Sequence, residues 1–197
     1  TFELDKIYTA DYYYVKFFDS DNGVIVCGYA KSNDTNESSR IYSTSNGGES
    51  WDIVGSGPAT NIIKGVVYVS SDVGFFCYDY VEGMDSNLYK TDDGGKTFAK
   101  VMLEEQELDS SAANPQGQET ETKTDSGKNG ADSSEQLRWG DVYKEALTPV
   151  VDSTGIITIY LTQGKNAVYN DGKTAAKYQS SDKGSTWKYI GQVEIKD

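Results

Sequence analysis

Short apolar runs alternate with polar turns along most of the chain. The first of these runs cover residues 13–18, 24–29 and 51–54, and a turn at 19–23 separates the first two. Short runs that are rich in aromatic and β-branched residues, and that are bounded by Gly, Asn, Asp or Ser, predict β-strands. A further strand around Tyr42 completes a first unit of four strands.

The same order of elements returns twice. The strands expected in the later units cover residues 63–69, 75–80, 88–89 and 99–103, and then 150–151, 156–161, 177–179 and 189–193. The glycines Gly23, Gly74 and Gly155 close equivalent turns. A period near 50 residues with four short strands per unit is typical of propeller blades. We therefore predict an all-β fold built from β-propeller-type blades of four antiparallel strands.

Before its last strand, each unit carries the same eight-residue pattern, at residues 44–51, 91–98 and 180–187. The pattern is Ser or Thr, any residue, Asp or Asn, any residue, Gly, any residue, Ser or Thr, and then Trp or Phe. An Asp or Asn oxygen accepts backbone N–H groups in such a turn, and Gly takes a positive φ without a steric clash. The pattern predicts a hairpin turn whose carboxylate is structural rather than catalytic or metal-binding, and whose aromatic ring packs against a neighbouring layer.

These motifs resemble Asp boxes, also called bacterial neuraminidase repeats. The resemblance implies a position on the turn between the outer two strands of a propeller blade, as in sialidases, sortilin-type receptors, some glycoside hydrolases and photosystem II stability-factor-like proteins. The chain departs from the family pattern at Asn46, where Asp is usual, and at Phe98, where Trp is usual. The residues with an implied structural role are Thr44, Asn46, Gly48, Trp51, Thr91, Asp93, Gly95, Phe98, Ser180, Asp182, Gly184 and Trp187.

The spacing of the repeats is broken once. Gly23 and Gly74 are 51 residues apart, but Gly74 and Gly155 are 81 residues apart. The excess falls in residues 104–137, an acidic and polar stretch that buries too little apolar surface to offset its ordering entropy, and we predict that it is disordered. One propeller-like domain is expected, with an N-terminal strand and two blades in residues 1–103, the insertion, and the third blade in residues 138–197.

Three blades are fewer than the 4–8 with which propellers close. One alternative is an irregular fourth blade that uses residues 1–10, with Phe2, Leu4, Ile7 and Tyr8, or the segment 137–139. A second is a homodimer in which two chains form a six-bladed ring and cover their open edges. A third is that the sequence belongs to a larger protein.

The formal net charge of −13 disfavours nucleic acid and anionic membranes as partners, because both attract positive surfaces. No apolar run approaches the roughly 20 residues of a membrane span, so direct insertion is not expected. The sequence starts at Thr1 without a visible signal peptide, which fits either a processed exported protein or a trimmed chain. We expect an extracellular or cell-surface location, with a lipid anchor as one option.

The cysteines Cys27 and Cys77 fall in the second strand of successive units. Counted from the aligned glycines they are one position out of phase, so they point to opposite faces of their strands. We predict two buried free thiols.

The inventory of catalytic residues is small. The chain has no His, which removes His-dependent nucleophile pairs and most transition-metal sites. The sialidase resemblance implies a triad of arginines that grips the substrate carboxylate, but the chain contains only Arg40 and Arg138. We therefore expect no sialidase activity, and we predict no catalytic residue and no cofactor.

Two groups of carboxylates are formal candidates for glycosidase chemistry. Asp79, Glu82 and Asp85 lie near one loop, and Asp141 and Glu145 would share a face if residues 140–147 were helical. We interpret both groups as solvated surface carboxylates.

A candidate cation site is similarly weak. Residues 19–23 begin like a calcium loop but lack its later bidentate Glu, so we interpret them as a turn and expect no bound metal.

The leading hypothesis is a non-catalytic exported or cell-surface module that recognises a protein or a glycan through its blade loops. Tyr12, Tyr13 and Tyr14, with Tyr78 and Tyr80, are candidate aromatic platforms for sugars, although strand packing explains most of them.

Two alternatives remain. Residues 17–23 and 91–98 are similar to photosystem II stability-factor-like repeats, which imply an assembly protein. The other alternative is a glycoside hydrolase that relies on carboxylates alone. Fold resemblance does not choose among these functions, because the loops that carry function differ between relatives.

Overall fold

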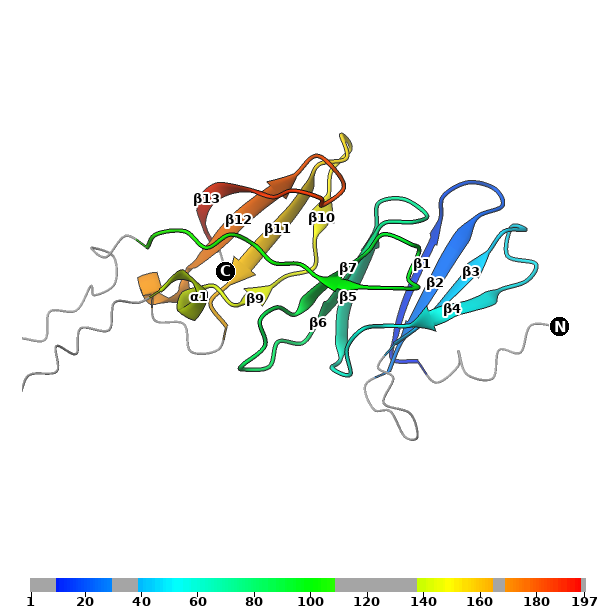
Figure 1. The fold of residues 1–197 in the computed structure, drawn as a ribbon, viewed down its shortest axis with the longest axis horizontal. Coiled ribbons are helices and arrows are strands. Elements are labelled where there is room, and N and C mark those ends of the chain that lie inside the picture. The colour runs from blue at the N-terminus through cyan, green and yellow to red at the C-terminus, as the bar shows by residue number, and fades with distance from the viewer. Residues whose placement is uncertain (1–9, 30–38, 109–137, 165–168, 196–197) are drawn as a thin grey trace, which may run out of the picture.

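The computed structural model describes residues 10–29, 39–108, 138–164 and 169–195, and within them it contains three antiparallel sheets that lie side by side (Figure 1). The first sheet consists of β1 (Tyr12–Phe17), β2 (Gly23–Gly28), β3 (Ser39–Thr44) and β4 (Asp52–Ser56). The second consists of β5 (Ile63–Tyr68), β6 (Gly74–Tyr78), β7 (Leu88–Thr91) and β8 (Ala99–Lys100). The third consists of β10 (Val150–Val151), β11 (Ile157–Thr162), β12 (Thr174–Ser180) and β13 (Lys188–Glu194), and β9 (Glu145–Ala146) also pairs with β11.

Each sheet is an up-and-down meander in which strands adjacent in sequence are hydrogen-bonded, except that β9 pairs with β11 and not with β10. The described helical elements are short, namely α1 (Trp139–Val142) and η3 (Tyr169–Gly172). The expected all-β class with four-stranded antiparallel sheets is therefore confirmed, and within the described ranges the sheets are not closed into a ring. Among the described residues no helix is long and apolar enough to cross a membrane.

The central strand of the molecule is β6, which is buried at every position because it lies between the other two sheets. Successive side chains of a strand point to opposite faces. Phe76 and Tyr78 belong to the cluster shared with the first sheet, while Phe75 and Cys77 belong to the cluster shared with the third. The strand β6 therefore contributes side chains to the hydrophobic clusters on both of its faces.

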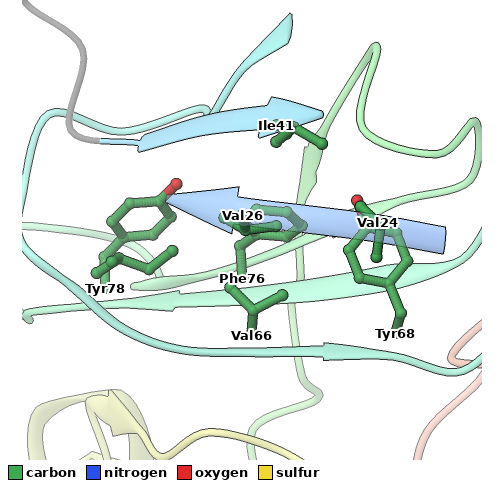
Figure 2. Close-up of a cluster of buried hydrophobic side chains, with 8 residues drawn as sticks. Val24, Val26, Ile41, Val66, Tyr68, Phe76 and Tyr78 are labelled. Atoms are coloured by element: carbon green, nitrogen blue, oxygen red, sulfur yellow. The ribbon is translucent and has the colours of Figure 1, made fainter. Parts of the chain in front are cut away.

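The contact between the first and second sheets is apolar (Figure 2). Its buried cluster consists of Val24, Val26, Ile41, Ile63, Val66, Tyr68, Phe76 and Tyr78. At its edge, the hydroxyl oxygens of Tyr12 and Tyr14 accept hydrogen bonds from the backbone N–H groups of Val66 and Tyr68, both at 3.0 Å. These two tyrosines therefore bind the sheets together rather than standing free as platforms for sugars.

A buried asparagine connects the second and third sheets. The side-chain amide of Asn87 donates to the carbonyl oxygens of Tyr78 at 2.8 Å and Ala146 at 2.9 Å. Its side-chain oxygen accepts the backbone N–H of Ala146 at 2.8 Å. Asn87 is only 1% exposed, so these bonds satisfy a polar group that would otherwise be costly to bury.

The helix considered for residues 140–147 is wrong. The helical turn α1 ends at Val142, and Glu145 lies in β9, where it pairs with Thr162 of β11. A neighbouring strand edge captures this segment, and such tertiary pairing overrides weak local helix propensity.

Both cysteines are free and buried, as predicted. Burial raises the pKa of the Cys27 thiol to about 11 and that of the Cys77 thiol to about 12.

The expected strand within residues 1–10 falls almost wholly outside the described residues, as does most of the predicted insertion. Its first residues, 104–108, are described and lie against the third sheet. The Tyr178 hydroxyl donates to the Glu104 carbonyl oxygen at 2.6 Å, and Leu108 packs against the cluster that contains Trp139.

Candidate functional site

The repeated turns are tight hydrogen-bonded structures. In the third copy, the Ser180 hydroxyl donates to Asp182 Oδ1 at 2.7 Å and accepts the N–H of Gly184 at 2.8 Å. Asp182 Oδ1 also accepts the N–H groups of Ser185 and Thr186, and its Oδ2 accepts the Thr186 hydroxyl at 2.6 Å. These bonds, first of all the one from the Thr186 hydroxyl, hold the pKa of Asp182 well below its usual range. The carboxylate is fully engaged within its own turn.

The second copy repeats this arrangement around Asp93, whose pKa is also lowered, chiefly by the Thr97 hydroxyl and N–H. The first copy has an amide in place of the carboxylate. Asn46 Oδ1 accepts the N–H of Ser50 at 3.0 Å, but Asn46 Nδ2 donates to the Ser50 hydroxyl at 2.9 Å. In this turn the hydrogen bond between the two side chains therefore has its donor and acceptor exchanged. The bond from the backbone N–H of Ser50 is the same as in the other copies.

Each turn places its aromatic residue against another ring. Trp51 contacts Phe17 within the first sheet, at a centroid distance of 5.9 Å. Phe98 contacts Phe76 at 4.9 Å, and Trp187 of the third unit contacts Phe75 of the second at 6.0 Å. We interpret the turn residues as parts of the scaffold.

In the turns between β1 and β2 and between β10 and β11, the acidic side chains also accept hydrogen bonds from residues of the same turn. Asp19 Oδ1 accepts the N–H groups of Asp21 and Asn22, at 2.8 Å and 2.7 Å. Asp152 Oδ1 accepts the N–H and the hydroxyl of Thr154. In the described part of the chain, no group of three or more Asp, Glu or Cys side chains is arranged to hold a metal ion.

The candidate site is a cleft of about 490 Å³ between the second and third sheets. Its walls come from the loop that joins β6 to β7, from the residues that follow β8, and from the segment around α1.

Ion pairs line the cleft. Lys144 Nζ lies 2.8 Å from Glu82 Oε1, which links the third unit to the second across the cleft. Lys100 Nζ lies 2.7 Å from Asp85 Oδ2. The hydrogen bond from Lys100 lowers the pKa of Asp85, and the bond to Glu82 raises the pKa of Lys144.

A further ion pair stands at the start of α1. Arg138 Nε lies 3.2 Å from Asp141 Oδ2. All three of these carboxylates thus have a cation beside them.

Two of the aromatic residues that line the cleft are almost completely buried. Trp139 and Tyr143 are 4% and 3% exposed, and their ring centroids are 4.7 Å apart. The Trp139 indole N–H makes no hydrogen bond within the described structure. Burial raises the pKa of the Tyr178 hydroxyl to about 12, and the nearby Trp139 indole N–H opposes this rise. At the rim, by contrast, Met102 is 63% exposed.

The structure brings together carboxylates that the sequence placed in separate groups. Glu82, Asp85 and Asp141 all line the cleft. Asp79 does not, and it pairs instead with Lys64 at 2.8 Å. Glu145 is also absent from the lining because it belongs to β9.

Sequence reasoning missed the cleft residues Met102, Trp139 and Lys144. Their common signal is position, because all three lie close to the ends of the long insertion. Of the proposed tyrosine platforms, Tyr78 is fully buried while Tyr80 lines the cleft. The two arginines lie in different parts of the structure, Arg40 in β3 of the first sheet and Arg138 immediately before α1.

No protein-family model matches the chain, and no curated protein matches its sequence. Among solved structures, a GH74 enzyme from Niastella koreensis is 16% identical with a TM-score of 0.40, over 85% of this chain and 19% of the enzyme. YCF48 bound to a D1 peptide is 13% identical with a TM-score of 0.31, over 89% of this chain and 66% of that one. Both are β-propeller proteins. The chain thus spans about a fifth of the length of the GH74 enzyme.

Proposed function

We propose that the chain is a non-catalytic binding module that holds a polypeptide segment in the cleft between the second and third sheets. The observation that carries this proposal is the exposed side chain of Met102 in a cleft where Glu82, Asp85 and Asp141 are each paired with a cation. An apolar anchor surrounded by polar groups is the usual make-up of a protein-binding surface, and methionine adapts its shape to different partners.

The burial of the aromatic residues favours a polypeptide over a glycan. A sugar ring stacks on an aromatic face that is open to solvent, but Trp139 and Tyr143 are almost completely buried. Tyr80 is half-buried and is the aromatic side chain of the cleft best placed to meet a ligand.

The ion pairs favour binding over catalysis. A glycosidase needs a carboxylic acid with a raised pKa that protonates the leaving group. In this cleft Glu82, Asp85 and Asp141 each have a cation partner, and the pKa of Asp85 is lowered. A carboxylate-only glycoside hydrolase remains the second candidate because these carboxylates share one cleft. An assembly factor would be a particular case of polypeptide binding.

The test is a selection of peptides from a random display library against the full chain, in parallel with a glycan array and fluorogenic glycosides. We expect peptides that carry an apolar side chain flanked by charges, and we expect their recovery to fall when the Met102→Asp variant replaces the parent. The matched control is Ile190→Asp, because Ile190 is 46% exposed and lies on β13, and it does not line the cleft. Glycan binders without peptide binders would overturn the proposal, and so would turnover of a glycoside that Glu82→Gln abolishes.

A further inference from the structure

The sulfur atoms of the chain all belong to described residues, and they differ in exposure. The chain contains two cysteines and two methionines. Cys27 and Cys77 are 0% and 2% exposed, Met84 is half-buried, and Met102 is 63% exposed. Met102 therefore carries the one sulfur of the molecule that is open to a reagent in solution.

Both methionines line the cleft between the second and third sheets. Met84 lies in the loop that joins β6 to β7, and Met102 lies two residues after β8. The neighbours of Met102 are held by the core, since Val101 is 8% exposed and Leu103 packs against two of the hydrophobic clusters. The backbone that carries Met102 is thus fixed, while its side chain stays at the rim of the cleft.

The sulfur of Met84 is already engaged. Met84 Sδ accepts the side-chain amide N–H of Asn61 at 3.3 Å and the backbone N–H of Val81 at 3.4 Å. A thioether sulfur is a weak acceptor, and these two bonds use the lone pairs with which it would react with an oxidant. Partial burial also limits the approach of a reagent to Met84. One cleft thus holds a protected methionine and an open one.

The thiols do not compete with Met102 for an oxidant. The reactive form of cysteine is the thiolate, and reactive cysteines are accessible to solvent. Cys27 and Cys77 are buried, and burial raises the pKa of their thiols to about 11 and about 12, so both stay protonated near neutral pH. An oxidant that acts on sulfur therefore meets Met102 first.

Oxidation changes the character of a methionine side chain. The thioether becomes a sulfoxide, which is polar and disrupts contacts that rely on an apolar side chain. With hydrogen peroxide as the oxidant, a lone pair of Met102 Sδ attacks one peroxide oxygen, and an S–O bond forms as the O–O bond breaks. The sulfur loses two electrons, and the other oxygen takes the proton of the transferred oxygen and leaves as water.

We propose that Met102 is a modification site for peroxide, and that its oxidation to the sulfoxide releases the polypeptide segment from the cleft. The release rests on the proposed function, in which Met102 is the apolar anchor. A sulfoxide oxygen that a bound peptide covers loses its water without a partner in exchange, so binding weakens. The change is reversible, because methionine sulfoxide reductases restore the thioether, with one enzyme for each sulfoxide epimer.

The modification site is tested on the full chain with dilute hydrogen peroxide, followed by peptide mapping in a mass spectrometer. We expect Met102 to gain one oxygen at least about fivefold faster than Met84, while Cys27 and Cys77 stay reduced. In the chain unfolded with urea, the two methionines should react at equal rates, because the fold causes the difference. Oxidation of Met84 as fast as Met102 in the folded chain, or oxidation of a cysteine before Met102, would overturn the modification site.

The release is tested with a library-selected peptide before and after peroxide treatment. We expect the Kd of the parent to rise about tenfold, and to return after treatment with both reductases and a dithiol. The Kd of Met102→Leu, whatever its own value, should not respond to peroxide, whereas Met84→Leu should respond like the parent. An unchanged Kd after complete oxidation of Met102 would overturn the release and leave the proposed function standing. A chain that binds no peptide would refute the proposed function and the release together, and the mapping experiment would then decide the modification site alone.

Discussion

The two contacts between neighbouring sheets differ in character. The first and second sheets share an apolar cluster, and the connection between them is short, residues 57–62. The second and third sheets share a cluster as well, but their contact opens into a cleft lined by ion pairs, and their connection runs from residue 101 to residue 144. The repeated units build the cores, and the candidate site lies where the two ends of the segment that interrupts the repeat meet the loop between β6 and β7.

The largest effect is expected in the closed contact. Phe76 is fully buried and contacts both Tyr68 and Phe98, so Phe76→Ala leaves a cavity and lowers the free energy of unfolding by about 3–5 kcal/mol. The comparison variant is Met102→Ala in the cleft, which is expected to change stability by less than about 0.5 kcal/mol because the side chain is already exposed. Urea denaturation measures both. Similar losses in the two variants would abolish the distinction between core and site.

The next effect concerns the buried asparagine of the second contact. Asn87→Leu leaves the N–H of Ala146 without its partner and leaves the Ala146 carbonyl oxygen with only the weak donor Cys77 Sγ, at 3.2 Å, and we expect a loss of about 2–3 kcal/mol in the free energy of unfolding. Asn61→Leu is the control, because Asn61 is half-buried and donates to a single backbone carbonyl, that of Asp79. Chemical denaturation in which Asn87→Leu is no more harmful than Asn61→Leu would show that the sheets do not depend on this residue.

The repeated turns give a smaller effect that depends on pH. The folded chain lowers the pKa of Asp93 and Asp182, so the unfolded state binds protons more readily than the folded state as the pH falls. Their contribution to stability is therefore present above the unfolded value of about 3.9 and is lost at lower pH. The double variant Asp93→Asn, Asp182→Asn should show a smaller fall in Tm between pH 7 and pH 3 than the parent. An equal fall would place the acid sensitivity elsewhere. Asn46→Asp is the reverse exchange, and it should increase the fall.

The smallest effect on stability is expected at the ion pair across the cleft. Lys144→Met removes the partner of Glu82, and exposed pairs of this kind contribute less than about 1 kcal/mol. The loss should shrink further in high salt, because salt screens exposed charges. Thermal unfolding at low and high salt provides the measurement. A loss of the size seen for Phe76→Ala would mean that the pair holds the sheets together.

The sequence predicted the strands and turns well because their signals are local. The alternation around Gly23, Gly74 and Gly155 is contained within short windows, and each window forms the expected strand, turn and strand. The cleft left no such signal. Its walls come from distant segments, and Glu82 and Asp141 look like ordinary solvated carboxylates until the fold brings them together. The helix considered for residues 140–147 was wrong for a related reason, since β11 determines the conformation of Glu145.

The most direct test of the central claim is a fluorescence titration of a library-selected peptide against the full chain and its variants. If the cleft is the binding site, Met102→Asp weakens binding at least about tenfold, which corresponds to about 1.4 kcal/mol. Ile190→Asp and Val15→Asp should leave the Kd unchanged, because they place the same charge on other exposed apolar positions. Equal affinities for Met102→Asp and Ile190→Asp would contradict the account, and loss of binding only in Val15→Asp would move the site to the side of the first sheet on which Val15 of β1 is exposed.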